Sequence, residues 1–140
     1  MPLCDCGREA SAYVTTNFQM VSDFHDAFGL PVLYKPTLDI APERLALRLS
    51  LITEERRELH DAIADSDLVE VADALADLLY VVYGMGHELG INLDKVFAEV
   101  QRSNMTKLGA DGRPIIREDG KILKGPHFEQ PRIAEVLGLT

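Results

Sequence analysis

Apolar and polar residues alternate along this chain mostly with the period of an α-helix, and glycine, proline and capping residues separate the periodic stretches. The pattern predicts four main helices, at about residues 17–28, 42–64, 68–88 and 93–108. Strands are not indicated before residue 109. The sequence therefore predicts an all-α fold, a four-helix bundle.

Capping residues mark the beginnings of these helices. Thr16 and Gln19 have the spacing of a capping box, which would open the first helix. Pro42 suits the first position of the second helix. Asp67 and Asn92 suit the N-caps of the third and fourth. These signals are local, so they predict helix boundaries independently of how the helices pack.

The length of 140 residues suits one domain and leaves no room for two independent cores. We expect a single domain over residues 1–140, with a short arm over 1–14 and a tail over 109–140. Within the tail, Asp119-Gly120 suits the turn of a short hairpin, and the alternative is an irregular tail.

The predicted third helix carries its acids along one line. At about 100° per residue, Glu70, Asp73 and Asp77 fall within an arc of about 60°. Nearly all other positions between Leu68 and Gly86 are apolar. A helix that is apolar over most of its circumference is a buried helix, so we expect these acids to point into the protein.

The predicted second helix brings a matching set of acids, Glu54, Glu55 and Glu58. Two helices joined by a tight connection pack antiparallel, so these acids would face those of the third helix. Five or six carboxylates there would repel one another unless they were protonated or bound a cation. Hard divalent cations prefer oxygen ligands, and Mg²⁺ needs few ligands from the protein.

Two other interpretations explain the same acids. The first is a narrow solvated stripe on each helix. The second is a di-iron carboxylate bundle, which requires a Glu-x-x-His step on each of two helices. Neither His60 nor His87 has a glutamate three residues before it, so the sequence disfavours the di-iron site.

Charge, hydropathy and cysteine content argue against several kinds of partner and site. The net charge is -9, whereas nucleic-acid binding depends on clustered cations. No apolar stretch approaches the roughly 20 residues of a membrane span, and the first residues lack a secretory pattern. Cys4 and Cys6 have no second cysteine pair to complete a zinc site or a disulfide framework. We therefore expect a cytoplasmic protein that binds neither nucleic acid nor membrane.

The acidic motifs also resemble those of a known family. The segment EERRELHDAIADSDLVEVADALADLLYVVYGMGHELGINLDKVFAEVQRSNMTKLG is similar to the MazG-like all-α nucleoside triphosphate pyrophosphohydrolases, in the dimeric dUTPase-like and phosphoribosyl-ATP-pyrophosphohydrolase-like branch. Glu54, Glu55 and Glu58 match the family's E-E-x-x-E signature, and Asp77 begins the matching Asp-Leu-Leu run. The resemblance covers roughly residues 18–126.

One position departs from the family pattern. Ala74 stands where the family has a glutamate three residues before the second aspartate. Either Asp73 replaces it, or the signature is displaced by one turn to Glu70-Val71-Ala72-Asp73. We expect Glu55, Glu58, Asp73 and Asp77 to bind the metal, with Glu70 assisting.

The resemblance implies a Mg²⁺-dependent hydrolase, with Mn²⁺ as a possible substitute, that cleaves a nucleoside triphosphate between the α and β phosphates. A carboxylate of the Glu54, Glu55 and Glu58 set would accept the proton of the attacking water. The expected substrate is a pyrimidine deoxynucleotide such as dUTP or dCTP. The alternatives are a phosphoribosyl-ATP-type substrate and a non-catalytic helical dimer that binds metal or nucleotide.

Cations would balance the triphosphate, or they would belong to a solvated hairpin. The candidate phosphate-binding residues are these cations and the neutral Asn104. They lie at the end of the fourth helix and on the segment that follows: Asn104, Lys107, Arg113, Arg117, Lys121 and Lys124. Phe18 would either stack on a base or pack in the core. The apolar face of the third helix, together with the resemblance, predicts a homodimer or a dimer of dimers.

Overall fold

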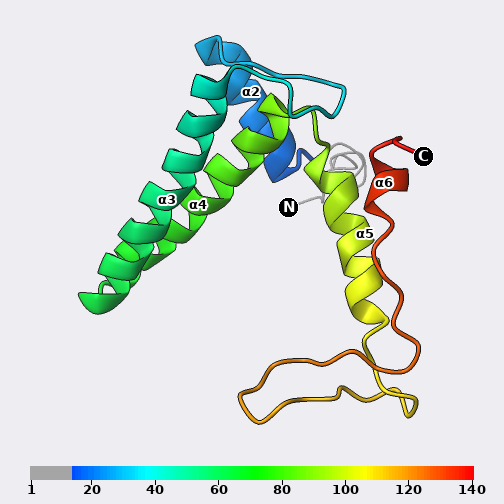
Figure 1. The fold of residues 1–140 in the computed structure, drawn as a ribbon. Helices are drawn as coiled ribbons and strands as arrows, with labels where there is room; N and C mark the ends of the chain where they lie inside the picture. The colour runs from blue at the N-terminus through cyan, green and yellow to red at the C-terminus, as the bar shows by residue number, and fades with distance from the viewer. Residues whose placement is uncertain (1–13) are drawn as a thin grey trace, which may run out of the picture. The chain divides into compact units, whose positions relative to one another are not determined.

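A computed structural model of the chain describes residues 14–140. Its long helices are those predicted: α2 (Asn17–Phe28), α3 (Pro42–Ala64), α4 (Leu68–Glu88) and α5 (Leu93–Met105), followed by the short α6 (Ile133–Val136) (Figure 1). The all-α fold class is thus confirmed. Nearly all of the predicted arm, including Cys4 and Cys6, lies outside the described residues. The chain divides into two compact units, Met1–Gly90 and Ile91–Thr140.

Local capping signals determine where the helices of the first unit begin. The Thr16 side chain accepts a hydrogen bond from the Gln19 backbone, and the Gln19 side chain accepts one from the Thr16 backbone, which completes the capping box of α2. Pro42 begins α3, and Asp67 caps α4 through the backbone N–H of Glu70. Each of these predicted beginnings is confirmed.

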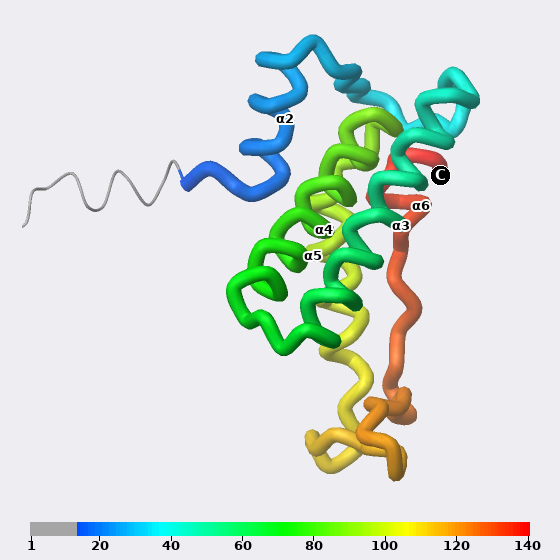
Figure 2. Tube along the Cα trace, turned by 90° about the vertical axis from the view of Figure 1, so that its left-hand side faces the viewer, coloured from blue at the N-terminus to red at the C-terminus, as the bar shows by residue number. Residues whose placement is uncertain are grey.

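Helices α3 and α4 form an antiparallel pair, which Figures 1 and 2 show side by side, and α2 packs against α4. The loop between α2 and α3 is hydrogen-bonded to the end of α4, because Leu33 donates to the His87 carbonyl and Thr37 to the Leu89 carbonyl. Gly90 follows with φ +66°, where a Cβ would lie 2.2 Å from the Lys35 carbonyl oxygen. These contacts fix the C-terminal end of α4.

The expectation that α4 is buried around most of its circumference is wrong within this unit. Leu68 is 80% exposed, Val69 76% and Leu79 53%, because α2 and α3 cover only part of the helix. Its small buried contact positions include Ala74 and Gly84. No helix within residues 14–140 has both the length and the apolarity needed to cross a membrane.

In the second unit, α5 ends at Met105, earlier than the predicted end before Gly109. The C-terminal segment causes this, since the Ser103 hydroxyl donates to the Glu129 carbonyl and the Glu129 N–H donates to the Thr106 hydroxyl. The Thr106 hydroxyl also donates to the Ser103 carbonyl, which closes the last turn of the helix. This ending depends on a contact across the sequence, so periodicity did not predict it.

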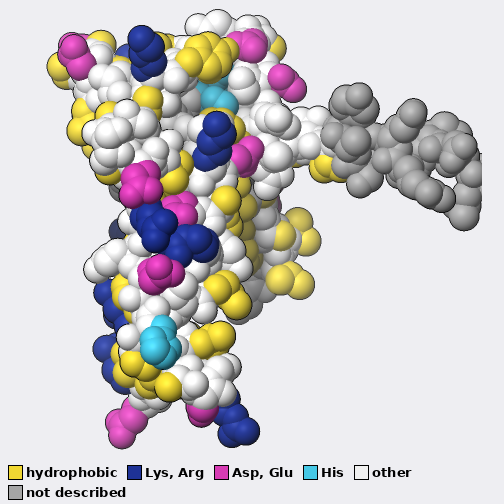
Figure 3. Space-filling view, turned by 90° about the vertical axis from the view of Figure 1, so that its right-hand side faces the viewer, with side chains coloured by type: hydrophobic (Ala, Val, Ile, Leu, Met, Phe, Trp, Pro, Cys, Tyr) yellow, Lys and Arg dark blue, Asp and Glu magenta, His cyan; other side chains and the backbone are white. Residues whose placement is uncertain are grey.

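Ion pairs attach the C-terminal segment to α5. Arg102 pairs with Glu99 at 2.7 Å and with Glu129 at 3.1 Å, and the Arg132 backbone N–H donates to Glu99. Hydrogen bonds from Arg102 and then from Arg132 lower the pKa of Glu99 to about 2. Figure 3, which faces the side of α5 and α6, shows acidic and basic side chains intermingled there.

The predicted turn at Asp119-Gly120 is present, with Gly120 at φ +87°. Arg117 donates its backbone N–H to the Lys121 carbonyl at 2.8 Å, and Ile116 and Ile122 form one isolated antiparallel bridge. Of the two alternatives for the tail, the chain forms a minimal hairpin whose flanks stay irregular in the described residues.

Candidate active site

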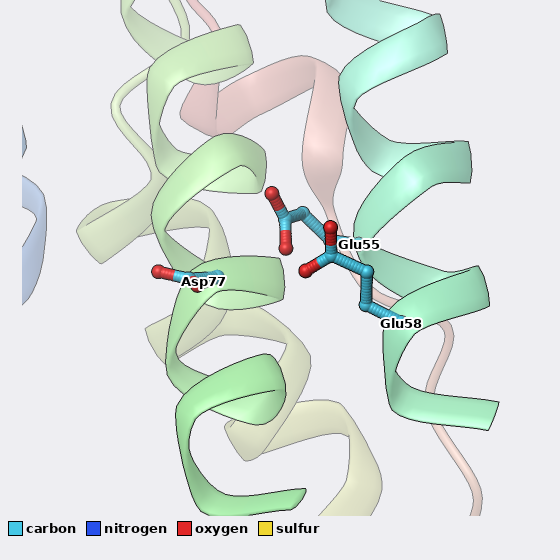
Figure 4. A group of neighbouring side chains, drawn as sticks. All are labelled: Glu55, Glu58 and Asp77. Carbon is cyan, nitrogen blue, oxygen red and sulfur yellow. The ribbon is translucent and has the colours of Figure 1, made fainter. Parts of the chain in front are cut away.

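Three carboxylates meet between α3 and α4. Glu55 and Glu58 lie on α3 one turn apart, and Asp77 lies on α4. Each offers an oxygen atom, and these oxygens lie within 4.8 Å of one another. Figure 4 shows the two glutamates reaching from α3 toward α4, where Asp77 lies. The antiparallel pairing predicted from sequence is what brings them together.

Glu55 is the member of the cluster whose surroundings are least favourable for a charge. Its Oε2 atom is buried and has no hydrogen-bond partner among the described residues. Burial raises the pKa of Glu55, and the negative charges of Glu58, Asp77 and Glu54 raise it further. An added positive charge would therefore stabilise the ionised form of this carboxyl.

These properties fit a hard divalent cation. The donor atoms are all carboxylate oxygens, which suit Mg²⁺ and Mn²⁺ and not the softer metals that prefer thiolate or imidazole. The unpaired Oε2 of Glu55 would gain the partner that it lacks. Three protein carboxylates suffice for Mg²⁺, because this ion keeps several waters and binds substrate phosphates.

Replacing Glu55 by glutamine is expected to raise the melting temperature of the metal-free chain by a few degrees. Because the pKa of Glu55 is raised, the folded state binds the proton of the Glu55 carboxyl more tightly than the unfolded state does. The free energy of unfolding therefore falls as the pH rises from the ordinary glutamate pKa to the raised one. Glu55→Gln removes that pH-dependent loss, which thermal unfolding in EDTA across this pH range would measure.

The same substitution is expected to reduce the rise in melting temperature produced by millimolar Mg²⁺, since ligand binding stabilises the folded state by linkage. Glu54→Gln is the matched control, because Glu54 is the adjacent glutamate, is exposed and lies outside the cluster. An unchanged response to Mg²⁺ in Glu55→Gln would contradict a metal site here.

The other predicted acids are not part of this cluster among the described residues. Glu54, Glu70 and Asp73 are exposed, and Glu70 lies in the first turn of α4. Ala74, one turn before Asp77, is 4% exposed, so the position without a carboxylate is buried. Participation of Glu54, Glu70 and Asp73 in catalysis or metal binding stays a prediction.

A buried ion-pair network, which the sequence analysis did not single out, joins α3 to α4 beyond the carboxylates. Glu88, 1% exposed, pairs with Arg48 at 3.0 Å and also with Arg44. Arg48 also donates to the Val81 carbonyl at 2.8 Å. Its guanidinium occupies the space above Gly84, where a Cβ would lie 2.0 Å from Nη2. The network thus fixes the two helices that carry the carboxylates.

The aromatic residues of α2 also pack against α4. The Phe18 ring stacks on His87 at 3.8 Å, and the His87 Nε2 lies 2.7 Å from the Phe18 carbonyl oxygen. His25 is 1% exposed, with Nδ1 2.9 Å from the Pro31 carbonyl oxygen. Phe18 therefore has a packing role in this structure, and contact with a substrate base stays a prediction.

The predicted phosphate-binding residues lie in the second unit. Asn104 is in the last turn of α5, and Lys107 follows its C-cap. Arg113, Lys121 and Lys124 are exposed. Arg117 pairs with Asp119 at 2.6 Å, and Lys124 lies 4.6 Å from the centroid of the Phe128 ring. Their role toward a triphosphate stays a prediction.

Comparison with known proteins identifies the family. The sequence profile of phosphoribosyl-ATP pyrophosphohydrolases matches residues 21–104, more than half of the chain and the whole of α3 and α4. The chain belongs to this family. The match confirms the resemblance to MazG-like pyrophosphohydrolases. The dUTPase-like assignment stays a prediction.

Two individual proteins are similar to the chain. Protein L479 of Acanthamoeba polyphaga mimivirus, which is uncharacterized, is 49% identical over 82 residues, which cover 56% of this chain. The match spans only 33% of that relative's length. The crystal structure of a candidate NTP pyrophosphohydrolase from Exiguobacterium sp. 255-15 is 29% identical, with a TM-score of 0.44, and covers 89% of this chain and 93% of that one.

Proposed function

We propose that the chain is a Mg²⁺-dependent nucleoside triphosphate pyrophosphohydrolase that releases a nucleoside monophosphate and pyrophosphate. The observation that carries this proposal is the cluster of Glu55, Glu58 and Asp77 on the segment that matches the family. Mn²⁺ would be a possible substitute for Mg²⁺, because it also accepts carboxylate and water ligands. The preferred substrate in this proposal is a pyrimidine deoxynucleotide such as dUTP or dCTP.

The carboxylates would both hold the cation and manage a proton. Glu55, Glu58 and Asp77 would hold Mg²⁺, which when bound neutralises phosphate charge and lowers the pKa of water. A glutamate of the Glu54, Glu55 and Glu58 set would accept the proton of the attacking water as the bond between the α phosphorus and the bridging oxygen breaks.

Asn104 would hydrogen-bond to the triphosphate, whose remaining charge would be balanced by Lys107 and by the cations of the hairpin that follows. The exposed apolar residues of α4 outside the pocket between α2 and α4, among them Leu75 and Val82, would be covered in a homodimer or a dimer of dimers. The net charge of -9 supports a protein that does not bind nucleic acid. A cytoplasmic location belongs to the same proposal.

The family description supports a second candidate substrate, phosphoribosyl-ATP. The buried Ala74, where the resemblance leads one to expect a glutamate, supports a third possibility, a helical dimer that binds metal or nucleotide without turnover. All three candidates share the carboxylate cluster, so only turnover separates them.

The deciding experiment measures pyrophosphate release from deoxynucleoside triphosphates, ATP and phosphoribosyl-ATP, with Mg²⁺ and with EDTA. We expect Mg²⁺-dependent release that is fastest with dUTP or dCTP. Faster release from phosphoribosyl-ATP would favour the second candidate. Binding of nucleotides without release from any of them would leave the non-catalytic dimer.

A further inference from the structure

A pocket of about 190 Å³ lies between α2 and α4. Asn17 at the beginning of α2 lines it, together with Ala76, Tyr80 and Tyr83 of α4. The remaining wall is formed by apolar side chains of the same two helices. A mostly apolar pocket with a few polar groups is the usual form of a small-molecule site.

Residues that line the pocket neighbour Asp77 along α4. Ala76 directly precedes Asp77 in the sequence. At about 100° and 1.5 Å per residue, Tyr80 lies about 60° around the helix from Asp77 and about 4.5 Å farther along its axis. Tyr83 lies about 9 Å along the axis and about 120° around the helix from Asp77, rotated in the same sense as Tyr80. The lining of the pocket therefore begins within one helical turn of Asp77.

The polar groups of the pocket have hydrogen-bonding capacity to offer. Among residues 14–140, no hydrogen bond involves the Asn17 side chain or the hydroxyls of Tyr80 and Tyr83. The Asn17 amide presents one acceptor and an adjacent donor group. This pairing is complementary to the edge of a nucleobase, which also places donors and acceptors side by side.

The tyrosine rings are held in place by α2. The rings of Phe24 and Tyr80 meet edge to face with their centroids 5.5 Å apart, and the ring centroids of Phe18 and Tyr83 lie 6.1 Å apart. Phe18 is itself stacked on the buried His87. The aromatic walls are therefore positioned before any ligand binds, which lowers the entropy cost of binding.

The geometry points to this pocket as the nucleobase subsite of the enzyme, an inference that rests on the proposed function. A planar base packs against Tyr80 and Tyr83, and the Asn17 amide hydrogen-bonds to its edge. The sugar then leads to the α phosphate beside Asp77. The volume of about 190 Å³ is below the roughly 300–1,000 Å³ of sites for drug-sized ligands, so the pocket suits a single base.

The test separates the base from the phosphates by using two probes in the presence of Mg²⁺. One is the non-hydrolysable α,β-imido analogue of dUTP or dCTP, and the other is tripolyphosphate, which has no base. Ala76→Phe fills the pocket, and Ala72→Phe is the matched control, because Ala72 is exposed on α4 and does not line the pocket. Calorimetry measures the dissociation constant of each probe for each variant.

We expect Ala76→Phe to weaken binding of the imido nucleotide by about tenfold or more and to leave tripolyphosphate binding unchanged. Ala72→Phe should resemble the unmodified chain with both probes. Equal affinity of the two alanine variants for the imido nucleotide, or equal loss of both probes in Ala76→Phe, would overturn the nucleobase subsite.

A second variant tests the subsite independently, in case Ala76→Phe does not fold. Asn17 is exposed at the first position of α2, so Asn17→Leu removes the amide without disturbing the core. We expect it to reduce the difference in affinity between the dUTP and dCTP analogues, and an unchanged difference would overturn the role of Asn17. Because these measurements need no turnover, a chain that binds the analogues through this pocket but releases no pyrophosphate would refute the proposed function alone.

Discussion

Replacing Asp77 by asparagine is expected to lower the rate of pyrophosphate release by about 10²–10³-fold, while the chain stays folded. Asparagine has the size of aspartate but no charge, so the variant loses one of the three carboxylates within 4.8 Å. The loss also relieves repulsion on Glu55, so the fold should not suffer. Initial rates with Mg²⁺ and far-ultraviolet circular dichroism would measure the two effects.

Asp73→Asn is the matched control for Asp77→Asn. Asp73 lies one turn earlier on the same helix, is exposed and is not part of the cluster. Its replacement should leave most of the activity. An equal loss in both variants would place Asp73 among the functional carboxylates, and an active Asp77→Asn would refute the site.

The helices could be predicted because their signals are local. The capping box at Thr16, the proline at position 42 and the caps at Asp67 and Asn92 each act within one helical turn. The end of α5 could not be predicted in this way. It depends on hydrogen bonds between Thr106 and a segment more than twenty residues later.

Helical angles alone predict only some members of the carboxylate cluster correctly. Angles place Asp73 and Asp77 on neighbouring lines of α4, but they differ by about 6 Å along the helix axis. That axial position depends on how α3 and α4 are aligned, which the connection between them sets. The structure therefore brings Asp77, and not the exposed Asp73, to Glu55 and Glu58.

The helical period also indicates where the ion-pair network lies, through the position of Gly84 on α4. Gly84 follows the line of Asp77 on α4, so the same face that presents a carboxylate to α3 later presents a residue without a side chain. The structure shows that this space holds the guanidinium of Arg48. Nothing local in the sequence marks Arg48 as buried, because its partner Glu88 is forty residues away.

Gly84→Ala is expected to destabilise the chain by about 2–4 kcal/mol, because the new methyl group must displace Arg48 from its buried partners. Arg48 is 5% exposed, so its guanidinium has no alternative position in solvent close by. Helix propensity alone predicts the opposite sign, since alanine stabilises a helix interior by about 1 kcal/mol relative to glycine. The sign of the change in melting temperature thus distinguishes the two effects, and the expected fall is roughly 10 °C.

The decisive control is the same substitution in a chain that carries Arg48→Ala. Without the guanidinium, the atoms at 2.0 and 2.9 Å from the added methyl group are gone, and only the His25 ring remains close, at 3.0 Å. Gly84→Ala should then be neutral or stabilising, so the two substitutions together should destabilise less than the sum of their separate effects. Additive losses in this double-mutant cycle would show that Gly84 matters for a reason other than room for Arg48.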